Sequence, residues 1–483
     1  IRDSAHIDHS GLIPLMYVNG FRGQVYSTSA TAQLCEIMLR DSAHIQMFEA
    51  EWRNRKAARS GGKLKEFVPL YDMDAAVNVC KQFVGCEYDR VYDIAEGIKI
   101  RFTDVGHLLG SASIEVWATE KTENGDVTEK IVFSGDIGNI NKPIIKDPKH
   151  VRDADYVVME STYGNRSHGG TPNYVEDLTD IFKRTFERGG NVVIPSFAVG
   201  RTQELLYIIR KIKEDNLVGR DFDVYMDSPL AIEATNIFIK NVESCFDDEA
   251  VELVRKGINP LSFPGLKYAT TGDESKQINF DPNPKVIISS SGMCEAGRIR
   301  HHLKHNLWRP ECTIVFVGYQ AVGTTGRIIV DGAEEIKLFG EPIQIKAEIV
   351  QLKGSSGHAD KDGLLCWINA FDTKPKKVFV VHGEDSVCDE FTECLKEEYG
   401  YDAMAPYTGG SYDLIADRVI SEGVKERKTR RTTSTQRGKT VFDRLVAAGK
   451  RLMTVITHNE GGTNKDLAKF TDQINALCDK WDR

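Results

Sequence analysis

Between about Asn173 and Val350, short runs of β-branched and other apolar residues alternate with stretches of helical pattern. The runs read NVVIPS, DVYMDS, KVIISSS and TIVFVGY, and the helical stretches begin near Thr202, Ala231 and Ala296. Strands that alternate with helices predict βαβ units, whose parallel strands form a buried sheet. The sequence therefore predicts an α/β domain over this part of the chain.

A second set of strand patterns lies on both sides of this region. From Ile98 to Asp136 the sequence reads IKIRFTDV, SIEVWAT and KIVFSGD, and the dipeptide Asn124-Gly125 predicts a hairpin turn between the last two runs. Further strands are expected at Tyr156–Met159 and in KKVFVVHGE, which follows Lys374. Since 483 residues are too many for one ordinary core, we expect two or three domains.

Charge and composition narrow the class of protein. The net charge of −9 argues against a protein that coats nucleic acid, although it leaves room for a local basic groove. The chain has no apolar run of about 18 residues and no secretory leader pattern, so we expect no membrane contact. The ten cysteines form no C-x-x-C pair, which favours free thiols and predicts a cytoplasmic location.

The C-terminal part of the sequence has a basic stretch followed by helical patterns. Residues 425–439 contain seven Lys or Arg and no apolar residue, which predicts a flexible basic linker that either follows RNA or is a solvated tether. Two amphipathic helices, VFDRLVAAGKRLMTVI and NKDLAKFTDQINALCDKW, are expected beyond the linker. They would either form a homodimer contact or cover the sheet.

Side chains of the types that bind metals follow several predicted strands. Near the start, the segment from Ser4 to His9 places two histidines and an aspartate within four residues. His107, Asp136 and His382 each follow a strand pattern, in DVGH, SGD and HGE. A single histidine of this kind is more often structural, but four such sets, three of them at strand ends, favour one joint site. Imidazole and carboxylate ligands suit zinc and also manganese.

The ordered motifs resemble those of one known family. They are AHIDHSG, DVGHLLGSA, FSGDIG, MESTYGNR, PSFAVGRTQELL, MDSPLA, SSSGMCEAGR, FVGYQAVGTTGR, SGHAD and VVHGE. The chain up to about Leu414 is similar to the β-CASP branch of the metallo-β-lactamase superfamily, the RNA-processing nucleases. The resemblance implies an α/β fold, in which a metallo-β-lactamase αββα sandwich, here without its first strands, carries an inserted β-CASP α/β domain.

The resemblance also implies domain boundaries. The lactamase-type core occupies 1–162 and returns over 346–420, and the β-CASP insert lies between them at 163–345. A basic linker at 421–440 and a helical tail at 441–483 follow.

The family's metal ligands carry over to two sets of residues. The resemblance implies that the first metal is bound by His6, His107 and Asp136. It implies that the second is bound by Asp8, His9, His382 and the shared Asp136. The expected cofactor is a pair of zinc ions, or manganese, that activates a hydroxide for hydrolysis of single-stranded RNA.

Three candidate catalytic residues follow from the same resemblance. Asp8 belongs to the metal motif, Glu160 would support the site as a carboxylate, and His358 would stabilise the scissile phosphate and transfer a proton. Endonucleolytic cleavage is expected, together with 5′-to-3′ exonucleolytic action.

Contacts with RNA are expected in the inserted domain. Ser290 and Arg298 lie in a segment that would hold phosphate on backbone amides at a helix start, although a tight structural turn explains this segment equally well. Arg201 and Arg327 are further candidates for an RNA groove, with surface ion pairs as the alternative for each.

The chain departs from the family at its start. The family motif is HxHxDH, and Ser4 stands at its first position. The hexapeptide RDSAHI also occurs twice, at Arg2–Ile7 and Arg40–Ile45, and the first residue is Ile1. We interpret these features as an incomplete or chimeric start.

Two other classes of function stay open. Ser4 favours a catalytically impaired RNA-binding scaffold, whereas the other metal ligands of the motif oppose it. A hydrolase of small molecules on the same core is less compatible with the large insert, since a small substrate needs no such cover.

Overall fold

The computed structural model describes residues 1–59, 66–123, 125–167, 169, 173–352, 356–425, 448–449, 452–453, 455–457 and 464–481. The chain divides into two compact units. The first unit comprises Ile1–Gly11, Gln24–Asp41 and Phe83–Lys425. The second comprises Leu12–Gly23, Ser42–Gln82 and the described residues after 425. All candidate site residues belong to the first unit.

One sheet of the first unit has seven strands in the order β17-β16-β7-β6-β5-β4-β3. The strands are β3 (Val91–Ala95), β4 (Ile98–Asp104), β5 (Ala112–Thr122), β6 (Gly125–Phe133), β7 (Tyr156–Glu160), β16 (Lys377–Val381) and β17 (Ala403–Met404). Pairing is antiparallel from β3 to β6 and parallel from β6 to β17. The predicted hairpin is confirmed, because Thr122 of β5 pairs with Gly125 of β6. As a result, β4, β6, β7 and β16 all end at the same edge of the sheet.

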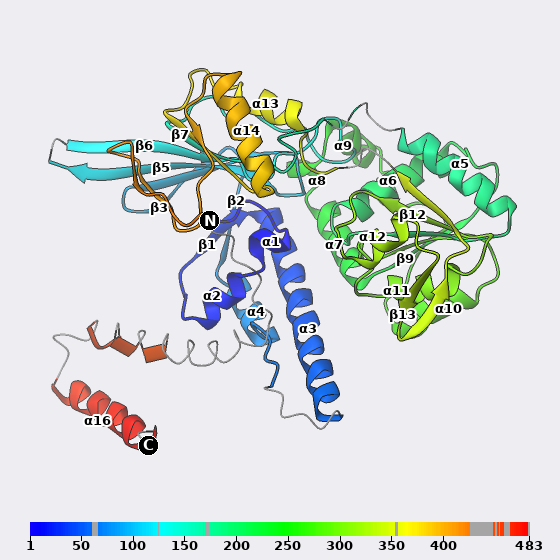
Figure 1. Ribbon diagram of the computed structural model, residues 1–483, viewed down its shortest axis with the longest axis horizontal. Coiled ribbons are helices and arrows are strands. Elements are labelled where there is room, and N and C mark those ends of the chain that lie inside the picture. The colour runs from blue at the N-terminus through cyan, green and yellow to red at the C-terminus, as the bar shows by residue number, and fades with distance from the viewer. Residues whose placement is uncertain are drawn as a thin grey trace. The chain divides into compact units, whose positions relative to one another are not determined.

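Two helices cover one face of this sheet, α13 (Lys361–Ile368) and α14 (Asp385–Glu397) (Figure 1). The strands contribute mostly valines to this core, and the helices contribute larger side chains. The strand residues include Val132, Val157, Met159, Val378 and Val380, and the helix residues include Leu364, Trp367, Phe391 and Leu395. Burial of this continuous apolar surface holds the strand ends in place.

The opposite face of the sheet is covered at one end only. The parallel pair β1 (Val25–Thr28) and β2 (Phe83–Cys86) packs Tyr26 and Cys86 against Phe102 of β4. Phe133, at the end of β6, keeps 41% of its surface exposed. In the part of the chain that the structure describes, no second large sheet covers Phe133.

The second sheet of this unit has six parallel strands in the order β10-β9-β11-β8-β12-β15. The strands are β8 (Val192–Pro195), β9 (Asp223–Asp227), β10 (Leu266–Tyr268), β11 (Lys285–Ser289), β12 (Thr313–Val317) and β15 (Glu348–Leu352). The inner strands β8, β11 and β12 are buried along their whole length, as their unbroken apolar runs predict. The predicted parallel α/β domain is therefore confirmed.

Helices precede or connect the strands of the second sheet and lie on both of its faces (Figure 1). They are α5 (Tyr174–Glu187), α6 (Arg201–Glu214), α7 (Pro229–Lys240), α8 (Val242–Cys245), α9 (Asp248–Arg255), α10 (Gly272–Phe280), α11 (Ile299–Asn306) and α12 (Thr325–Val330). A small hairpin, β13 (Glu335–Leu338) with β14 (Glu341–Gln344), precedes β15. Because β15 pairs with β12, the second sheet extends to Leu352, beyond the predicted boundary at 345.

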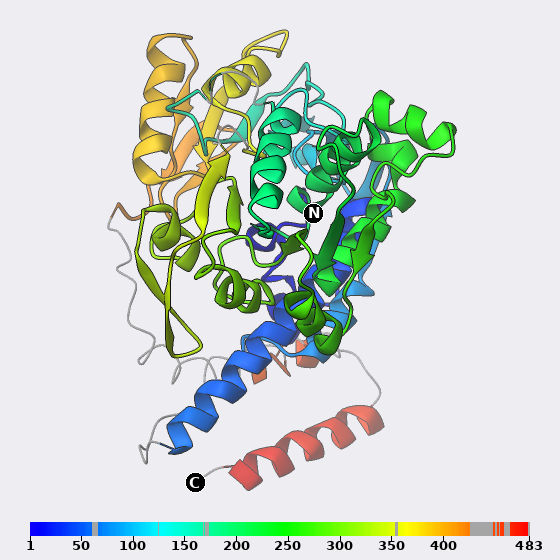
Figure 2. The same cartoon turned by 90° about the vertical axis from the view of Figure 1, so that its right-hand side faces the viewer.

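The remaining elements complete the chain. In the second unit, α2 (Ile13–Val18) packs on α4 (Met73–Cys80). The long helix α3 (Ser29–Arg59), blue in Figure 2, runs through both units. A hairpin of β18 (Ser411–Asp413) and β19 (Arg418–Ser421) follows β17.

The last helix, α16 (Asn464–Trp481), confirms the second predicted tail helix. The predicted linker, from 426 on, and most of the first predicted tail helix lie outside the described residues. No described helix combines the length and apolar character that a bilayer crossing requires.

Candidate metal centre

Ligand-type side chains from four segments meet at one edge of the seven-stranded sheet. His6 precedes the short helix α1 (Ile7–Ser10), which carries Asp8 and His9. The other segments are the turns after β4, β6 and β16, which carry His107, Asp136 and His382. The atoms of His6, His107 and Asp136 lie within 4.8 Å of one another, and so do those of Asp8, His9 and His382. The structure thus groups these residues as the two ligand sets that the sequence predicts, with Asp136 beside both.

Asp136 is the centre of this arrangement. Its Oδ2 atom lies 3.1 Å from Nε2 of His9, 3.6 Å from Nε2 of His107 and 3.8 Å from Nδ1 of His6. Its Oδ1 atom lies 3.3 Å from Nε2 of His382. Burial opposes the charge of this carboxylate, but the nearby imidazoles of His6 and His9 outweigh burial and hold the pKa of Asp136 well below its usual range.

The buried atoms around Asp136 fit a divalent cation. His107 is 4% exposed, and burial lowers its pKa well below the ordinary value, so the ring is neutral and has a free lone pair. Oδ1 of Asp136 is buried and has no hydrogen-bond donor among the described residues. Since a buried acceptor without a partner costs free energy, a cation between the carboxylate and the imidazoles would satisfy this donor set.

Ser4 has a different role from that of a metal ligand. The side chain is 1% exposed, and its Oγ accepts a hydrogen bond of 3.3 Å from the backbone N–H of His6. It therefore stabilises the turn that enters α1. The first ligand set consists of three side chains in this chain.

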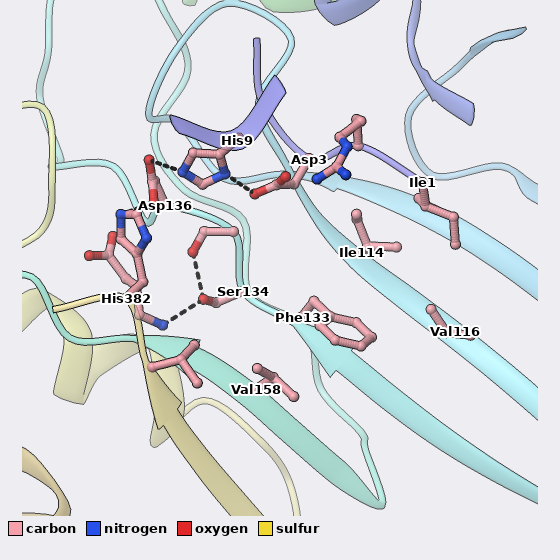
Figure 3. A pocket seen from close by; sticks show the side chains of 14 residues that line it. Ile1, Asp3, His9, Ile114, Val116, Phe133, Ser134, Asp136, Val158 and His382 are labelled. Atoms are coloured by element: carbon pink, nitrogen blue, oxygen red, sulfur yellow. Dashed lines mark hydrogen bonds and ion pairs between the residues drawn. The ribbon is translucent and has the colours of Figure 1, made fainter. Parts of the chain in front are cut away.

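Asp3 is a site residue that sequence reasoning missed. Its Oδ2 lies 2.9 Å from Nδ1 of His9, whose other ring nitrogen faces Asp136 (Figure 3). Burial opposes protonation of His9, but the nearby carboxylates of Asp136 and Asp3 raise its pKa to about 11. The only signal in the sequence is an acidic residue directly before the metal motif. A carboxylate behind a ligand histidine fixes the orientation of the ring.

A pocket of about 370 Å³ adjoins this centre (Figure 3). Asp3, His9, Asp136 and His382 form its polar end. Apolar side chains of the sheet, among them Ile114, Val116, Phe133 and Val158, form the rest. The centre is therefore open on the side of the partly covered sheet face.

Glu160 and His358 form a second pair of interacting residues beside the ligands. Nδ1 of His358 lies 3.1 Å from Oε1 of Glu160, which also accepts a 2.6 Å hydrogen bond from the backbone of Ile137. The His358 ring centroid is 4.4 Å from that of His107. Burial opposes protonation of His358, but the charge and hydrogen bond of Glu160 outweigh it and raise its pKa. Two of the three predicted catalytic residues, Glu160 and His358, therefore lie at the centre and contact each other.

All three candidate RNA-binding arginines are paired with carboxylates. Arg298 lies 2.7 Å from Oδ1 of the fully buried Asp227 and donates to the carbonyls of Ala269 and Thr270. Arg327 binds Asp331 through Nε at 2.8 Å. These contacts explain both arginines as structural residues, and their contact with RNA stays a prediction.

Arg201 is linked to the metal centre through two ion pairs and one hydrogen bond. It pairs with Glu204, whose carboxylate also lies 3.4 Å from Nζ of Lys142. Nζ of Lys142 donates a 2.8 Å hydrogen bond to the backbone carbonyl of His107. The first turn of α6 is thus tied to the loop that carries a metal ligand.

Ser290 lies in a run of turns that follows β11. The helix expected from about Ala296 begins only at Ile299, so Ser290 is outside its first turn. Gly297 explains why the helix begins later than expected. Its φ is +82°, and a Cβ at this position would lie 2.3 Å from the Ser290 carbonyl oxygen. The hydroxyl of Ser290 is buried without a hydrogen-bond partner among the described residues.

Two family models match the chain. Residues 202–329 match the Beta-Casp domain, a range that holds β9 to β12 of the second sheet and most of α6 to α12. Residues 342–406 match the Zn-dependent metallo-hydrolase RNA specificity domain, which includes His358 and His382.

The curated relatives agree with these matches. Ribonuclease TTHA0252 of Thermus thermophilus is 33% identical over 79% of this chain and 80% of its own length. The RNase J-like protein of Methanocaldococcus jannaschii is 31% identical over 79% of this chain and 80% of its own length. Transcription termination factor FttA of Methanosarcina mazei is 32% identical over 83% of this chain, which spans only 60% of that relative. The chain therefore belongs to the β-CASP branch of the metallo-β-lactamase superfamily, a family of metal-dependent RNA nucleases.

Proposed function

We propose that this chain hydrolyses phosphodiester bonds of single-stranded RNA with two zinc ions, which manganese can replace. The observation that carries the proposal is the position of Asp136 between the two ligand sets. A buried carboxylate whose Oδ2 faces His6, His107 and His9 and whose Oδ1 faces His382 contacts both sets, so it is suited to bridge two cations. When bound, such ions supply Lewis acidity toward the phosphate and a water whose pKa falls toward neutrality.

The other ligand side chains would each bind one of the two ions. His6 and His107 would hold the first ion with Asp136, and Asp8, His9 and His382 would hold the second. Asp8 is the most exposed of them, at 61%, which places it at the solvent side where substrate enters. Because Asp3 fixes the ring of His9, that ligand would keep its geometry when RNA binds.

His358 would act on the phosphate and the leaving oxygen. Glu160 binds Nδ1 of His358 and favours its protonated form, so Nε2 can donate a hydrogen bond or a proton to the leaving oxygen. The proton would return from water after product release. Glu160 is a positioning residue in this scheme, because it acts through His358.

The substrate proposal rests on the family matches. The matched RNA specificity domain contains His358, and the named relatives include a ribonuclease and an RNase J-like protein. We propose endonucleolytic cleavage, together with 5′-to-3′ exonucleolytic action. None of the described cysteines forms a disulfide, which supports the further proposal of a cytoplasmic location.

One observation favours a second candidate function. Ser4 bonds to the backbone and leaves three side chains for the first ion. With a weakened first ion, the chain would be a catalytically impaired protein that binds RNA as a scaffold.

Cleavage of end-labelled single-stranded RNA tests the proposal, with zinc or manganese supplied to the purified chain. The test compares the chain with Ser4→His and His382→Asn, and with His44→Ala as a control at an exposed histidine of α3. Asparagine is chosen at 382 because this residue has φ +50°, which asparagine tolerates better than alanine.

We expect Ser4→His to cleave faster than the unmodified chain, and His382→Asn to be at least about 100-fold slower, because it loses a ligand of the second ion. His44→Ala should match the unmodified chain. If no variant cleaves although all of them bind RNA, the scaffold function replaces the nuclease.

A further inference from the structure

Tyr163 and Arg166, in the segment that follows β7, lie one after the other beside His358. The Tyr163 ring centroid lies 6.1 Å from that of His358, with the rings nearly perpendicular at 71°. The guanidinium carbon of Arg166 lies 4.4 Å from the Tyr163 ring centroid. The three groups form a continuous row that begins at the candidate proton donor and ends at a cation on the surface.

The backbone holds this row in place. The N–H of Gly164 donates to the carbonyl of Ser161 at 2.9 Å, and that of Arg166 donates to Tyr163 at 3.2 Å. The carbonyl of Arg166 accepts a 3.0 Å hydrogen bond from the N–H of Lys361, at the start of α13. These bonds tie the segment to the strand and helix that carry the centre.

Gly164 allows the segment to pack closely on α14. A Cβ at this position would lie 2.7 Å from the Phe391 ring, which is fully buried. The turn is therefore fixed against the core, so Arg166 loses little further freedom when it binds a ligand.

The charge of Arg166 is available to an anion. The residue is exposed, and no carboxylate of the described residues lies within ion-pair distance of its guanidinium. By contrast, Arg298 and Arg327 are paired with Asp227 and Asp331. An arginine offers a planar pair of N–H donors that matches the oxygens of a phosphate.

We propose that Arg166 binds the RNA phosphate next to the one that is cleaved, with Tyr163 as the positioning residue that holds its guanidinium. This inference rests on the proposed function, because it takes His358 as the group at the scissile phosphate. An RNA strand whose scissile phosphate lies at His358 brings its neighbouring phosphate toward Arg166. The stacked ring restricts the guanidinium, so binding would favour one register of the RNA over others.

The first test measures RNA binding without cleavage. Fluorescence anisotropy with a short labelled single-stranded RNA, in chelator, compares the unmodified chain with Arg166→Ala and Arg166→Lys. Arg90→Ala is the matched control, because Arg90 is also an exposed arginine over a tyrosine ring, at 5.4 Å from Tyr92.

We expect Arg166→Ala to weaken binding about tenfold and to reduce the slope of log K against log salt by about 0.7, the value for one phosphate on a single strand. Arg166→Lys should keep the salt slope and recover part of the affinity. Arg90→Ala should bind as the unmodified chain does. An unchanged salt slope in Arg166→Ala would overturn the proposal.

The second test locates the phosphate. Single neutral methylphosphonates are placed one position before or after the mapped cleavage site, and kcat/KM is measured with zinc. One of the two should slow the unmodified chain about tenfold and leave Arg166→Ala unaffected, since the contact is already lost. Equal slowing of both proteins at each position would overturn the subsite and leave the nuclease function intact. If the unmodified chain binds RNA with the Arg166-dependent salt slope but never cleaves, the anion site stands and the nuclease function fails.

Discussion

Nδ1 of His9 lies 2.9 Å from Oδ2 of Asp3, and Nε2 of the same ring lies 3.1 Å from Oδ2 of Asp136. The imidazole is therefore held between two carboxylates, one inside the ligand sets and one behind them. Asp3 is itself anchored, because its carbonyl accepts a hydrogen bond of 2.9 Å from the N–H of Ala112 in β5. The segment before α1 thus connects the sheet to the metal centre.

Asp3→Asn should weaken metal binding without unfolding the chain. The amide keeps the shape of the side chain but loses the charge that orients His9, and losses of this kind typically cost about 10- to 100-fold in metal affinity. Competition with a chromophoric chelator measures the affinity, and Asp126→Asn, at an exposed site in β6, is the control. Equal affinity in Asp3→Asn and the unmodified chain would show that Asp3 does not support His9.

Asp104 should make the first unit less stable as pH rises. Burial raises the pKa of its carboxyl from 3.8 to about 7, although a 3.0 Å hydrogen bond from Gly106 opposes this shift. Between pH 3.8 and about pH 7, the Asp104 carboxyl is protonated in the folded state and ionised in the unfolded state. The free energy of unfolding therefore falls by up to about 4 kcal/mol as pH rises through this range.

Asp104→Asn removes this loss because it stays neutral and keeps the acceptor for Gly106. Relative to the unmodified chain, the variant should gain stability between pH 4 and pH 8 in denaturant titrations. Asp93→Asn, an exposed change in β3, should show no such gain. A difference between Asp104→Asn and the unmodified chain that is constant with pH would contradict the expectation.

Arg298→Ala should destabilise the domain of the second sheet. Asp227 is fully buried, and removal of Arg298 leaves its charge supported only by Ser275 and His302. Loss of one partner of a buried pair costs about 3 kcal/mol. Thermal denaturation measures the loss, with the exposed Arg255→Ala as a control expected to cost under about 1 kcal/mol. A variant of normal stability with weaker RNA binding would instead support the RNA contact predicted from sequence.

Glu160→Gln should lower kcat far more than it changes RNA affinity. The amide still contacts His358 but no longer favours its protonated form, and general acid catalysis typically contributes about 100- to 10,000-fold. Single-turnover cleavage and anisotropy measure the two quantities, with Glu120→Gln on the exposed part of β5 as control. A parallel loss of affinity and rate would point to a folding defect in place of a lost catalytic role.

Much of the fold follows from local sequence patterns. The inner strands β8, β11 and β12 are buried on both faces, so their apolar runs mark them without ambiguity. The edge strand β15, Glu348–Leu352, has one partner and a weaker pattern, which explains why the predicted boundary at 345 fell before it.

The site residues that belong to short sequence motifs could be predicted. His107, Asp136 and His382 follow β4, β6 and β16, and these three strands run in the same direction, so their ends lie together. Contacts between residues that are far apart in the sequence leave no such pattern. The pairing of Arg298 with Asp227 joins residues 71 positions apart, so the sequence could not show that this arginine is engaged.

The direct test of the central claim is the number of zinc ions bound per folded chain, measured by native mass spectrometry for the unmodified chain and for Asp136→Asn. Since Asp136 lies beside both ligand sets, we predict two ions in the unmodified chain and loss of both in the variant at the same free zinc concentration. A folded Asp136→Asn variant that retains two ions would contradict the account of a shared carboxylate.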